Sequence, residues 1–357
     1  ESNWKSCGIK PTNMEIITRI KKSARILLKG EPKKKQRAEI PAITKDEVAE
    51  IKQFFPREKF FILGHARSGT TLLMRLARLH PEVHCNYQAH FFTRKPLLKS
   101  LVDSTEIEEW LTRKSNRWNQ GRDLSPLVLR AAADFILERD AAREGKRIVG
   151  DKSPSSTIHG AAVRDMRAIY PDAKLVYIVR DGRDVLISER FRNFVEDSKF
   201  LSAEDKRIIA DLRADSPSFS DGRRSIFTES FIRRVAKGWV TNLQETDDEA
   251  RKLYGKNYFS LRYEDLLKNP FKEMSRLWKF LSVKTIHKSL EKKIQAEMES
   301  NPDEEWQAKR DEGIASFLPK GQAGNWQRLF SAKDKSVFKE VAGEMLVKWK
   351  YEDLVGW

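Results

Sequence analysis

The sequence has few cysteines and no long apolar run, and both absences narrow the classes of protein to which it can belong. Cys7 and Cys85 are the two cysteines among 357 residues, too few for a disulfide framework. No stretch approaches the roughly 18 apolar residues of a membrane-spanning helix. Hydrophobic residues nevertheless make up 39% of the chain, which is enough for a large core and excludes a disordered protein. The length fits one large domain or two ordinary ones.

Positive charge is what the sequence has in excess. The 68 Lys and Arg exceed the 52 Asp and Glu, which gives a net charge of +16. Half of this excess lies in residues 1–37, where 11 basic and 3 acidic residues leave +8. Apolar side chains recur at helical spacing from Ile16 to Leu28, which predicts a basic amphipathic helix. We expect residues 1–45 to form an arm that either packs on its own domain or docks on an anionic membrane surface or a partner protein.

The charge does not by itself indicate a nucleic-acid partner. We find no zinc-finger, RNA-recognition or helix-turn-helix signature, so no nucleic acid is expected. The expected location is cytoplasmic. If the arm docks on a membrane, the protein would lie at the periphery of that membrane. Because the chain begins at Glu1 rather than Met, the luminal domain of a trimmed membrane protein is the alternative.

Beyond the arm, short apolar runs typical of buried strands alternate with helical patterns. The alternation predicts an α/β fold over residues 46–357, with a P-loop-like, three-layer arrangement of a mostly parallel sheet between helices. Residues 196–228 are polar and poorly patterned, and we expect them to form an insertion or an acceptor loop. Strands are expected at residues 59–64, 82–85, 147–150, 173–179 and 258–263.

A turn containing two glycines follows the first expected strand. Its spacing matches the nucleotide-binding signature GxxxxGK[ST], except that Thr70 replaces the Lys, which disfavours an ordinary kinase or NTPase. A strand, such a turn and a helix start direct N–H groups and the helix dipole at an anion. Arg67 adds a cation, and hydroxyl groups follow it. The sequence reads Gly64, His65, Ala66, Arg67, Ser68, Gly69, Thr70, Thr71.

A second candidate anion site follows the strand expected at 173–179. Arg180 lies at its carboxyl end, where open α/β sheets bind ligands, and Ser188 follows two helical turns later on the same side. A guanidinium group and a hydroxyl suit a second phosphate. The alternative is a surface ion-pair cluster of Arg180, Asp181, Arg183 and Asp184.

With these motifs, the chain resembles the sulfotransferases that use 3′-phosphoadenosine 5′-phosphosulfate (PAPS). The residues 67–71 are similar to the 5′-phosphosulfate loop of that family, and Arg180 with Ser188 is similar to its 3′-phosphate pair. Residues 79–90 resemble protein-tyrosine sulfotransferases and related bacterial enzymes in particular. The resemblance extends over about residues 58–350.

Two further segments carry the same resemblance. Residues 320–326 (KGQAGNW) are similar to the family loop RKGxxGDW, with Pro319 in place of its Arg. The resemblance implies that Lys320 and Gly321 grip the 3′-phosphate. Tyr263 opens a YEDL segment, which implies a position near the nucleotide.

The resemblance implies in-line transfer of a sulfuryl group from PAPS to an acceptor hydroxyl or amine, without a metal. Arg67 and Thr71 are expected to stabilise charge on the phosphosulfate, and Lys152 is similar to a Lys that stabilises the leaving group in tyrosine sulfotransferases. The acceptor can be a carbohydrate, lipid, peptide or small alcohol. The three histidines and the cysteine in residues 80–90 do not have the spacing of a standard zinc site.

The catalytic base is the point at which the sequence departs from the family. Related enzymes have Glu at the position of Gln88, and an amide cannot accept the proton. His90 has a suitable pKa and is our candidate base. The alternatives are Asp151, an inactivating replacement of Glu by Gln, and a catalytically silent nucleotide-binding relative.

Overall fold

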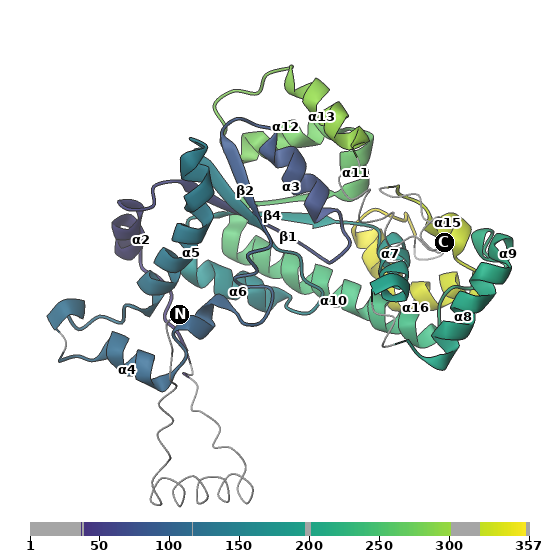
Figure 1. The fold of residues 1–357 in the computed structure, drawn as a ribbon, viewed down its shortest axis with the longest axis horizontal. Coiled ribbons are helices and arrows are strands. Elements are labelled where there is room, and N and C mark those ends of the chain that lie inside the picture. Colours follow the sequence, from purple (N-terminus) through teal and green to yellow (C-terminus); the bar gives the residue numbers. More distant parts are fainter. Residues whose placement is uncertain (1–36, 38, 116, 197–200, 301–321, 355–357) are drawn as a thin grey trace, which may run out of the picture.

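A sheet of five parallel strands organises the computed structural model, which describes residues 37, 39–115, 117–196, 201–300 and 322–354 (Figure 1). The strand order in this described part is β2-β3-β1-β4-β5, and every neighbouring pair is parallel. The predicted α/β class is therefore confirmed. The strands are β1 (Glu58–Gly64), β2 (Val83–Tyr87), β3 (Ile148–Lys152), β4 (Lys174–Val179) and β5 (Tyr258–Arg262).

Helices cover both faces of the sheet, as the continuous apolar strands require. Successive side chains of β1 point to opposite faces, so Phe60 and Ile62 enter one core and Phe61 and Leu63 enter the other. The first core lies under α3 (Thr70–Arg78), α12 (Pro270–Phe280) and α13 (Leu290–Glu299). The second lies under α5 (Ser125–Arg143), α6 (Gly160–Ile169) and α10 (Glu229–Tyr254) (Figure 1).

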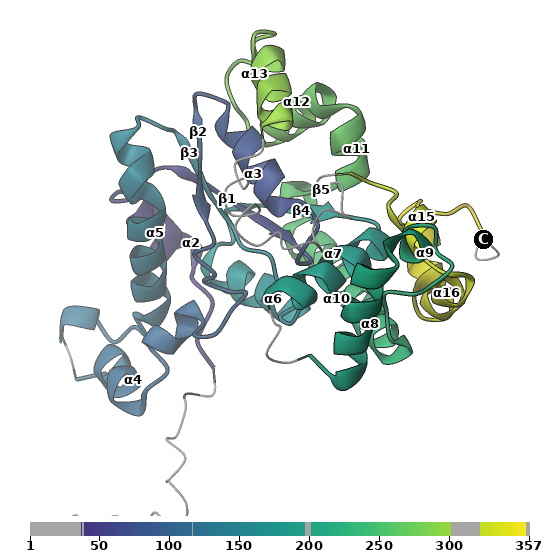
Figure 2. The same ribbon diagram turned by 45° about the vertical axis from the view of Figure 1, so that its right-hand side comes forward.

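A group of helices lies beyond the carboxyl end of β4. α7 follows β4 almost directly, and α15 and α16 pack against it (Figure 2). The remaining helices of the described part precede, connect or follow the strands. The bounds are α2 (Lys45–Lys52), α4 (Thr105–Thr112), α7 (Gly182–Glu196), α8 (Ala203–Ala214), α9 (Ser216–Ser220), α11 (Tyr263–Lys268), α15 (Trp326–Leu329) and α16 (Ala332–Lys348), with 3-10 turns η1 (Leu98–Leu101), η2 (Arg117–Asn119) and η4 (Gly255–Asn257).

The described part of the segment 196–228, expected to be an insertion or an acceptor loop, contains two helices, α8 and α9. Ser202 and Asp205 form a reciprocal capping box that begins α8. Ile209 and Leu212 of α8 are buried against the rest of the domain. The local signal was therefore a helix cap followed by an apolar pair, which the high polarity of the segment obscured.

Several predicted features lie outside the described residues. The amphipathic helix of the 1–45 arm is among them, and so are Lys320 and Gly321. In the part of the chain that the structure describes, no helix has the length and low polarity needed to cross a membrane. In that same part, no three His, Cys, Asp or Glu side chains are grouped so that they could hold a metal ion.

The strand order determines where a ligand can bind. From β1 the chain passes to β2 and β3 on one side, and then to β4 and β5 on the other. Ligands of open α/β sheets bind outside the carboxyl ends of the strands, at such a change of direction. The ends of β1, β3 and β4 therefore define the candidate site.

Candidate active site

The loop between β1 and α3 has the backbone form that a phosphate cradle requires. Arg67 and Gly69 adopt positive φ angles of 69° and 81°. A Cβ atom on Gly69 would lie 2.2 Å from the ring of Tyr263, so the position admits only glycine. The Ser68 hydroxyl oxygen is buried and has no hydrogen-bond partner. Such an orphaned polar atom at a helix N-terminus fits a site for an anionic group.

Arg180 connects three of the predicted motifs. Its Nη1 donates to the carbonyl of Arg67 at 3.1 Å, and its Nη2 donates to the carbonyl of Gln322 at 3.1 Å. Its guanidinium carbon lies 4.9 Å from the centre of the Tyr263 ring. The indole N–H of Trp239 donates a hydrogen bond to the Arg180 carbonyl at 3.1 Å. The structure thus brings together motifs that are far apart in the sequence.

Ser188 lies on the same side of the site, as its helical spacing from Arg180 predicts. Its hydroxyl oxygen accepts from Nε of Arg67 at 2.9 Å. Arg180 retains one polar atom, Nε, that is buried without a hydrogen-bond partner. The alternative ion-pair cluster exists beside it: Arg183 binds Asp181 at 2.7 Å and also pairs with Glu352. Among the described residues, the ion pairs of this cluster belong to Arg183, while the charge of Arg180 acts on the neighbouring Asp184.

Asp184 binds the backbone of residues 324–326, which belong to the predicted KGQAGNW motif. Its carboxylate accepts from the N–H of Gly324 at 2.6 Å and from the N–H of Trp326 at 3.2 Å. The guanidinium carbon of Arg183 lies 3.5 Å from the centre of the Trp326 ring. Burial raises the pKa of Asp184. Sequence analysis did not assign this role to Asp184, and only the repeated Arg-Asp pairs in Arg180–Asp184 hinted at it.

Lys152 ends β3 and lies beside the cradle. Its side chain is buried, and Nζ donates to the hydroxyl of Thr71 at 3.2 Å. Nζ also lies 3.7 Å from the centre of the exposed Tyr87 ring, a contact that sequence analysis missed. Burial lowers the pKa of Lys152 to about 8, although Asp151 and Cys85 oppose the shift. Among the described residues, Lys152 forms no ion pair with its chain neighbour Asp151.

Asp151 points away from Lys152, because successive residues of a strand face opposite sides of the sheet. One carboxylate oxygen accepts from the N–H of Ala89 at 2.9 Å, and the other accepts from the Ser153 hydroxyl. Burial raises the pKa of Asp151 to about 6. Because both oxygens are engaged inside the protein, Asp151 is suited to hold the turn after β2.

That turn places Gln88 and His90 beside the carboxyl end of β3. Both residues adopt left-handed backbone angles, with φ of 58° and 54°, and non-glycine residues in this region often mark functional sites. Gln88 donates its N–H to the Lys152 carbonyl at 2.9 Å. His90 donates its N–H to the Ser153 hydroxyl at 2.9 Å. The turn is therefore bonded directly to the end of β3.

The His90 ring is held in one orientation. Its Nδ1 lies 2.8 Å from the Thr93 hydroxyl oxygen. The ring is partly buried, and burial together with the positive charges of Arg94 and Lys152 lowers the pKa of His90. A neutral imidazole with one nitrogen already occupied can take up a proton on the other, which is the property that a base requires.

Comparison with known proteins identifies the family. Residues 59–288, which are more than half of the chain, match the model described as "Sulfotransferase family". The chain belongs to the sulfotransferase family. The matched range contains the cradle, Lys152, Arg180 and Tyr263, so the resemblance inferred from the motifs is confirmed.

Individual relatives are distant. Protein-tyrosine sulfotransferase A of Caenorhabditis elegans is 25% identical over 233 residues, which cover 62% of this chain and 49% of that protein. The protein-tyrosine sulfotransferase of Drosophila melanogaster is 24% identical over 226 residues, which cover 62% of this chain and 38% of that protein. The chain thus spans about half or less of the curated relatives it matches. The structure of mouse sulfotransferase SULT7A1 complexed with PAP has a TM-score of 0.45 and 16% identity, covering 87% of this chain and 92% of that one.

Proposed function

We propose that this chain transfers a sulfuryl group from PAPS to an acceptor hydroxyl, with 3′-phosphoadenosine 5′-phosphate (PAP) as the second product. The observation that carries the proposal is the position of Arg180, which binds the loop after β1 and the segment after Lys320 and lies against Tyr263. Two buried polar atoms of this cradle, Oγ of Ser68 and Nε of Arg180, lack partners and suit anionic oxygens.

The residues divide between the two ends of the nucleotide. The N–H groups at the start of α3, with the hydroxyls of Ser68, Thr70 and Thr71, suit the 5′-phosphosulfate. Arg180 and Ser188 suit the 3′-phosphate. Lys320 and Gly321 are predicted to add to that second group by family resemblance. Tyr263 closes the cradle beneath Gly69.

The proposed reaction needs positioning, one cation and one base. The acceptor oxygen forms a bond to sulfur while the bond from sulfur to the bridging phosphate oxygen breaks. That oxygen keeps the electron pair and leaves with PAP, and the Lys152 ammonium group offsets its charge. His90 takes the proton of the acceptor hydroxyl, because Gln88 has no basic atom. No covalent enzyme intermediate is required.

Calorimetry with PAP and ATP tests the proposed donor. We expect PAP to bind and ATP to bind at least about tenfold more weakly, because Thr70 replaces the Lys that reaches the γ-phosphate of a triphosphate. Arg180→Ala should weaken PAP binding, since it removes a charged donor. Tight binding of ATP with no binding of PAP would contradict the proposal and favour the kinase or NTPase alternative.

The two protein-tyrosine sulfotransferases support a tyrosine hydroxyl as the acceptor. A screen with radiolabelled PAPS should therefore include tyrosine-containing peptides beside carbohydrates, glycolipids and small alcohols. Label transferred only to a non-peptide acceptor would remove the tyrosine hypothesis and leave the donor hypothesis intact. Binding of PAP without transfer to any class would favour the catalytically silent relative.

The proposed roles predict a bell-shaped pH dependence of kcat/KM. His90 must be neutral to act as a base, so activity should be lost as the pH falls through its lowered pKa. Lys152 must be protonated, so activity should also be lost as the pH rises through about 8. In Lys152→Arg the alkaline limb should move to higher pH, and in His90→Ala the acidic limb should disappear with most of the activity. An unchanged acidic limb and full activity in His90→Ala would remove His90 as the base.

Gly69→Ala is expected to weaken PAP binding by at least about tenfold, since the new Cβ meets the Tyr263 ring and the left-handed backbone is costly for alanine. Gly145→Ala is the matched control, because Gly145 also has a positive φ but no atom lies within 4 Å of the added Cβ. Gly145→Ala should be destabilised by the left-handed backbone alone, and it should bind PAP with unchanged affinity in calorimetry. Equal affinities in the two variants would argue against a cradle at Gly69.

A further inference from the structure

A cleft of about 710 Å³ lies where α7, α8 and α10 meet. Arg190 of α7 and Arg234 of α10 line it, together with Phe231. Ser202 and Thr228, the caps of α8 and α10, also line it. α7 therefore contributes to two places. Ser188 belongs to the nucleotide cradle, and Arg190, two residues later, points about 200° around the helix into the cleft.

Arg190 is a buried cation with an unused donor. Its side chain is 2% exposed. Nε donates to the Ile226 carbonyl at 2.6 Å, and Nη1 pairs with Asp205 at 2.7 Å. Nη2 is buried and has no hydrogen-bond partner. A buried N–H without an acceptor is costly, so a ligand oxygen at this position would satisfy it.

Two helices begin at the cleft, and their N-termini both carry partial positive charge there. α8 has 12 residues and α10 has 26, and each presents the positive end of its dipole there. The guanidinium carbon of Arg234 lies 5.1 Å from the centre of the Phe231 ring, and that of Arg190 lies 4.9 Å from it. Two guanidinium groups thus lie near the same ring, which concentrates positive charge at the cleft and favours a bound anion.

Two carboxylates of α8 also line the cleft. Asp205 is already bound by Arg190 and by the N–H of Ser202 at 3.0 Å, so it offsets one charge without reaching Nη2. Glu204 is exposed. Arg234, the N–H groups of the two helix starts and Nη2 of Arg190 still favour an additional negative group.

We propose that this cleft is a second oxyanion site, which binds a sulfate or phosphate group independently of the nucleotide cradle. The group can be a free inorganic ion or a substituent of a larger acidic ligand. Both sources present the same tetrahedral oxygens to Arg190 and Arg234. The proposal does not rest on the sulfotransferase activity, because none of its residues belongs to the cradle.

The test is calorimetric titration of sodium sulfate into the full chain, with and without saturating PAP. We expect a saturable sulfate site that persists with PAP bound and that Arg234→Gln weakens by about tenfold. Arg207→Gln is the matched control, because Arg207 is exposed on α8 and does not line the cleft. Complete loss of sulfate binding in the presence of PAP, or equal affinity in Arg234→Gln and Arg207→Gln, would overturn the proposal.

A second variant addresses Arg190 itself. Arg190→Lys keeps the positive charge but removes Nη2, and it should weaken sulfate binding while circular dichroism shows an intact fold. If the folded variant binds sulfate with unchanged affinity, the assignment of Nη2 is wrong. A sulfated disaccharide in the same titration separates the two sources. At least about tenfold tighter binding than inorganic sulfate assigns the cleft to a larger acidic ligand, and equal or weaker binding assigns it to the free ion.

Discussion

Lys152→Met is expected to lower kcat by about 10²–10³-fold while the chain stays folded and still binds PAP. The substitution keeps a long unbranched side chain and removes only the ammonium group. That group lies beside the Thr71 hydroxyl, at the end of the strand next to the cradle. Charge develops on the leaving oxygen only as the bond to sulfur breaks. Loss of the cation should therefore reduce kcat much more than the affinity for product.

Burial strengthens the electrostatic effect of the Lys152 ammonium group, and it also means that an apolar side chain can replace Lys152 without loss of stability. The Lys152 side chain is inaccessible to solvent, and burial lowers its pKa to about 8. An apolar side chain of similar volume at such a position is tolerated, because it escapes the cost of burying a charge. We therefore expect the thermal midpoint of Lys152→Met to be at least as high as that of the unchanged chain.

Lys174→Met is the control for this experiment. Lys174 also lies on a strand, but it begins β4 at the opposite edge of the sheet, where it donates to Ser282 at 2.7 Å. Its replacement should leave kcat unchanged. If Lys152→Met also leaves kcat unchanged, Lys152 does not stabilise the leaving group. If PAP affinity falls as much as kcat, Lys152 contributes to binding rather than to catalysis.

The sequence was sufficient to predict the sheet and the motifs at its carboxyl edge. Strands such as β1 and β4 are buried on both faces, so they appear in the sequence as continuous apolar runs bounded by polar residues. Because all carboxyl ends of parallel strands meet at one edge, residues that follow different strands could be expected to converge. Arg180 and Lys152 were found in this way.

The contacts between strands could not be predicted from local patterns. Lys152 reaches Thr71 because β3 pairs directly with β1, in a register that sets Ile62 opposite Lys152. Nothing in either segment encodes that register alone. Tyr87 covers Lys152 from β2, for the same reason. Asp184 was missed because its partners, Gly324 and Trp326, are about 140 residues away in the sequence.

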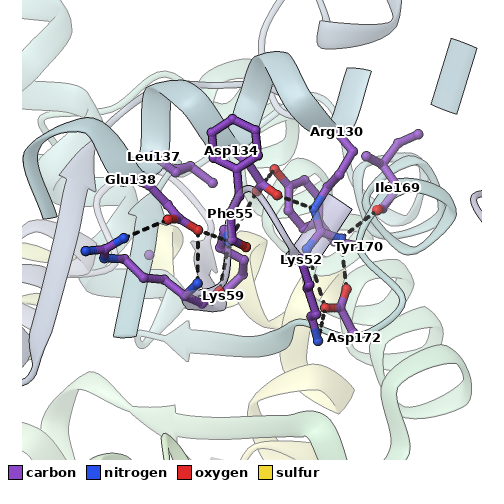
Figure 3. Close-up of polar contacts among 12 residues, drawn as sticks. Lys52, Phe55, Lys59, Arg130, Asp134, Leu137, Glu138, Ile169, Tyr170 and Asp172 are labelled. Atoms are coloured by element: carbon purple, nitrogen blue, oxygen red, sulfur yellow. Dashed lines mark hydrogen bonds and ion pairs between the residues drawn. The ribbon is translucent and has the colours of Figure 1, made fainter. Parts of the chain in front are cut away.

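Asp134→Ala is expected to destabilise the domain by about 3–5 kcal/mol, the usual effect of removing one member of a buried charged group. Asp134 lies on α5 and is fully buried. It accepts from Nε of Arg130 at 2.8 Å and from the Tyr170 hydroxyl at 2.9 Å, and it lies 3.5 Å from Nζ of Lys59 (Figure 3). Chemical denaturation measures the loss.

The size of the effect follows from what remains after the substitution. Lys59 and Arg130 stay buried, and each loses part of its compensating charge. Lys59 keeps Glu138 at 2.6 Å, and Arg130 keeps Asp172 at 2.8 Å (Figure 3). These contacts join α5 to the start of β1 and to the segment before β4. The cluster is thus at the amino edge of the sheet, away from the cradle, and PAP affinity of the folded variant should be unchanged.

Two comparisons separate a lost ionic contact from a simple cavity. Asp140→Ala changes the same residue type on the same helix. Among the described residues, Asp140 pairs with two exposed arginines, so the denaturation midpoint should not move. Combining Asp134→Ala with Lys59→Met should cost less than the sum of the two single changes, because the double variant no longer buries the Lys59 charge. Strictly additive losses would show that Asp134 and Lys59 do not interact, and would assign the destabilisation to packing and to Arg130.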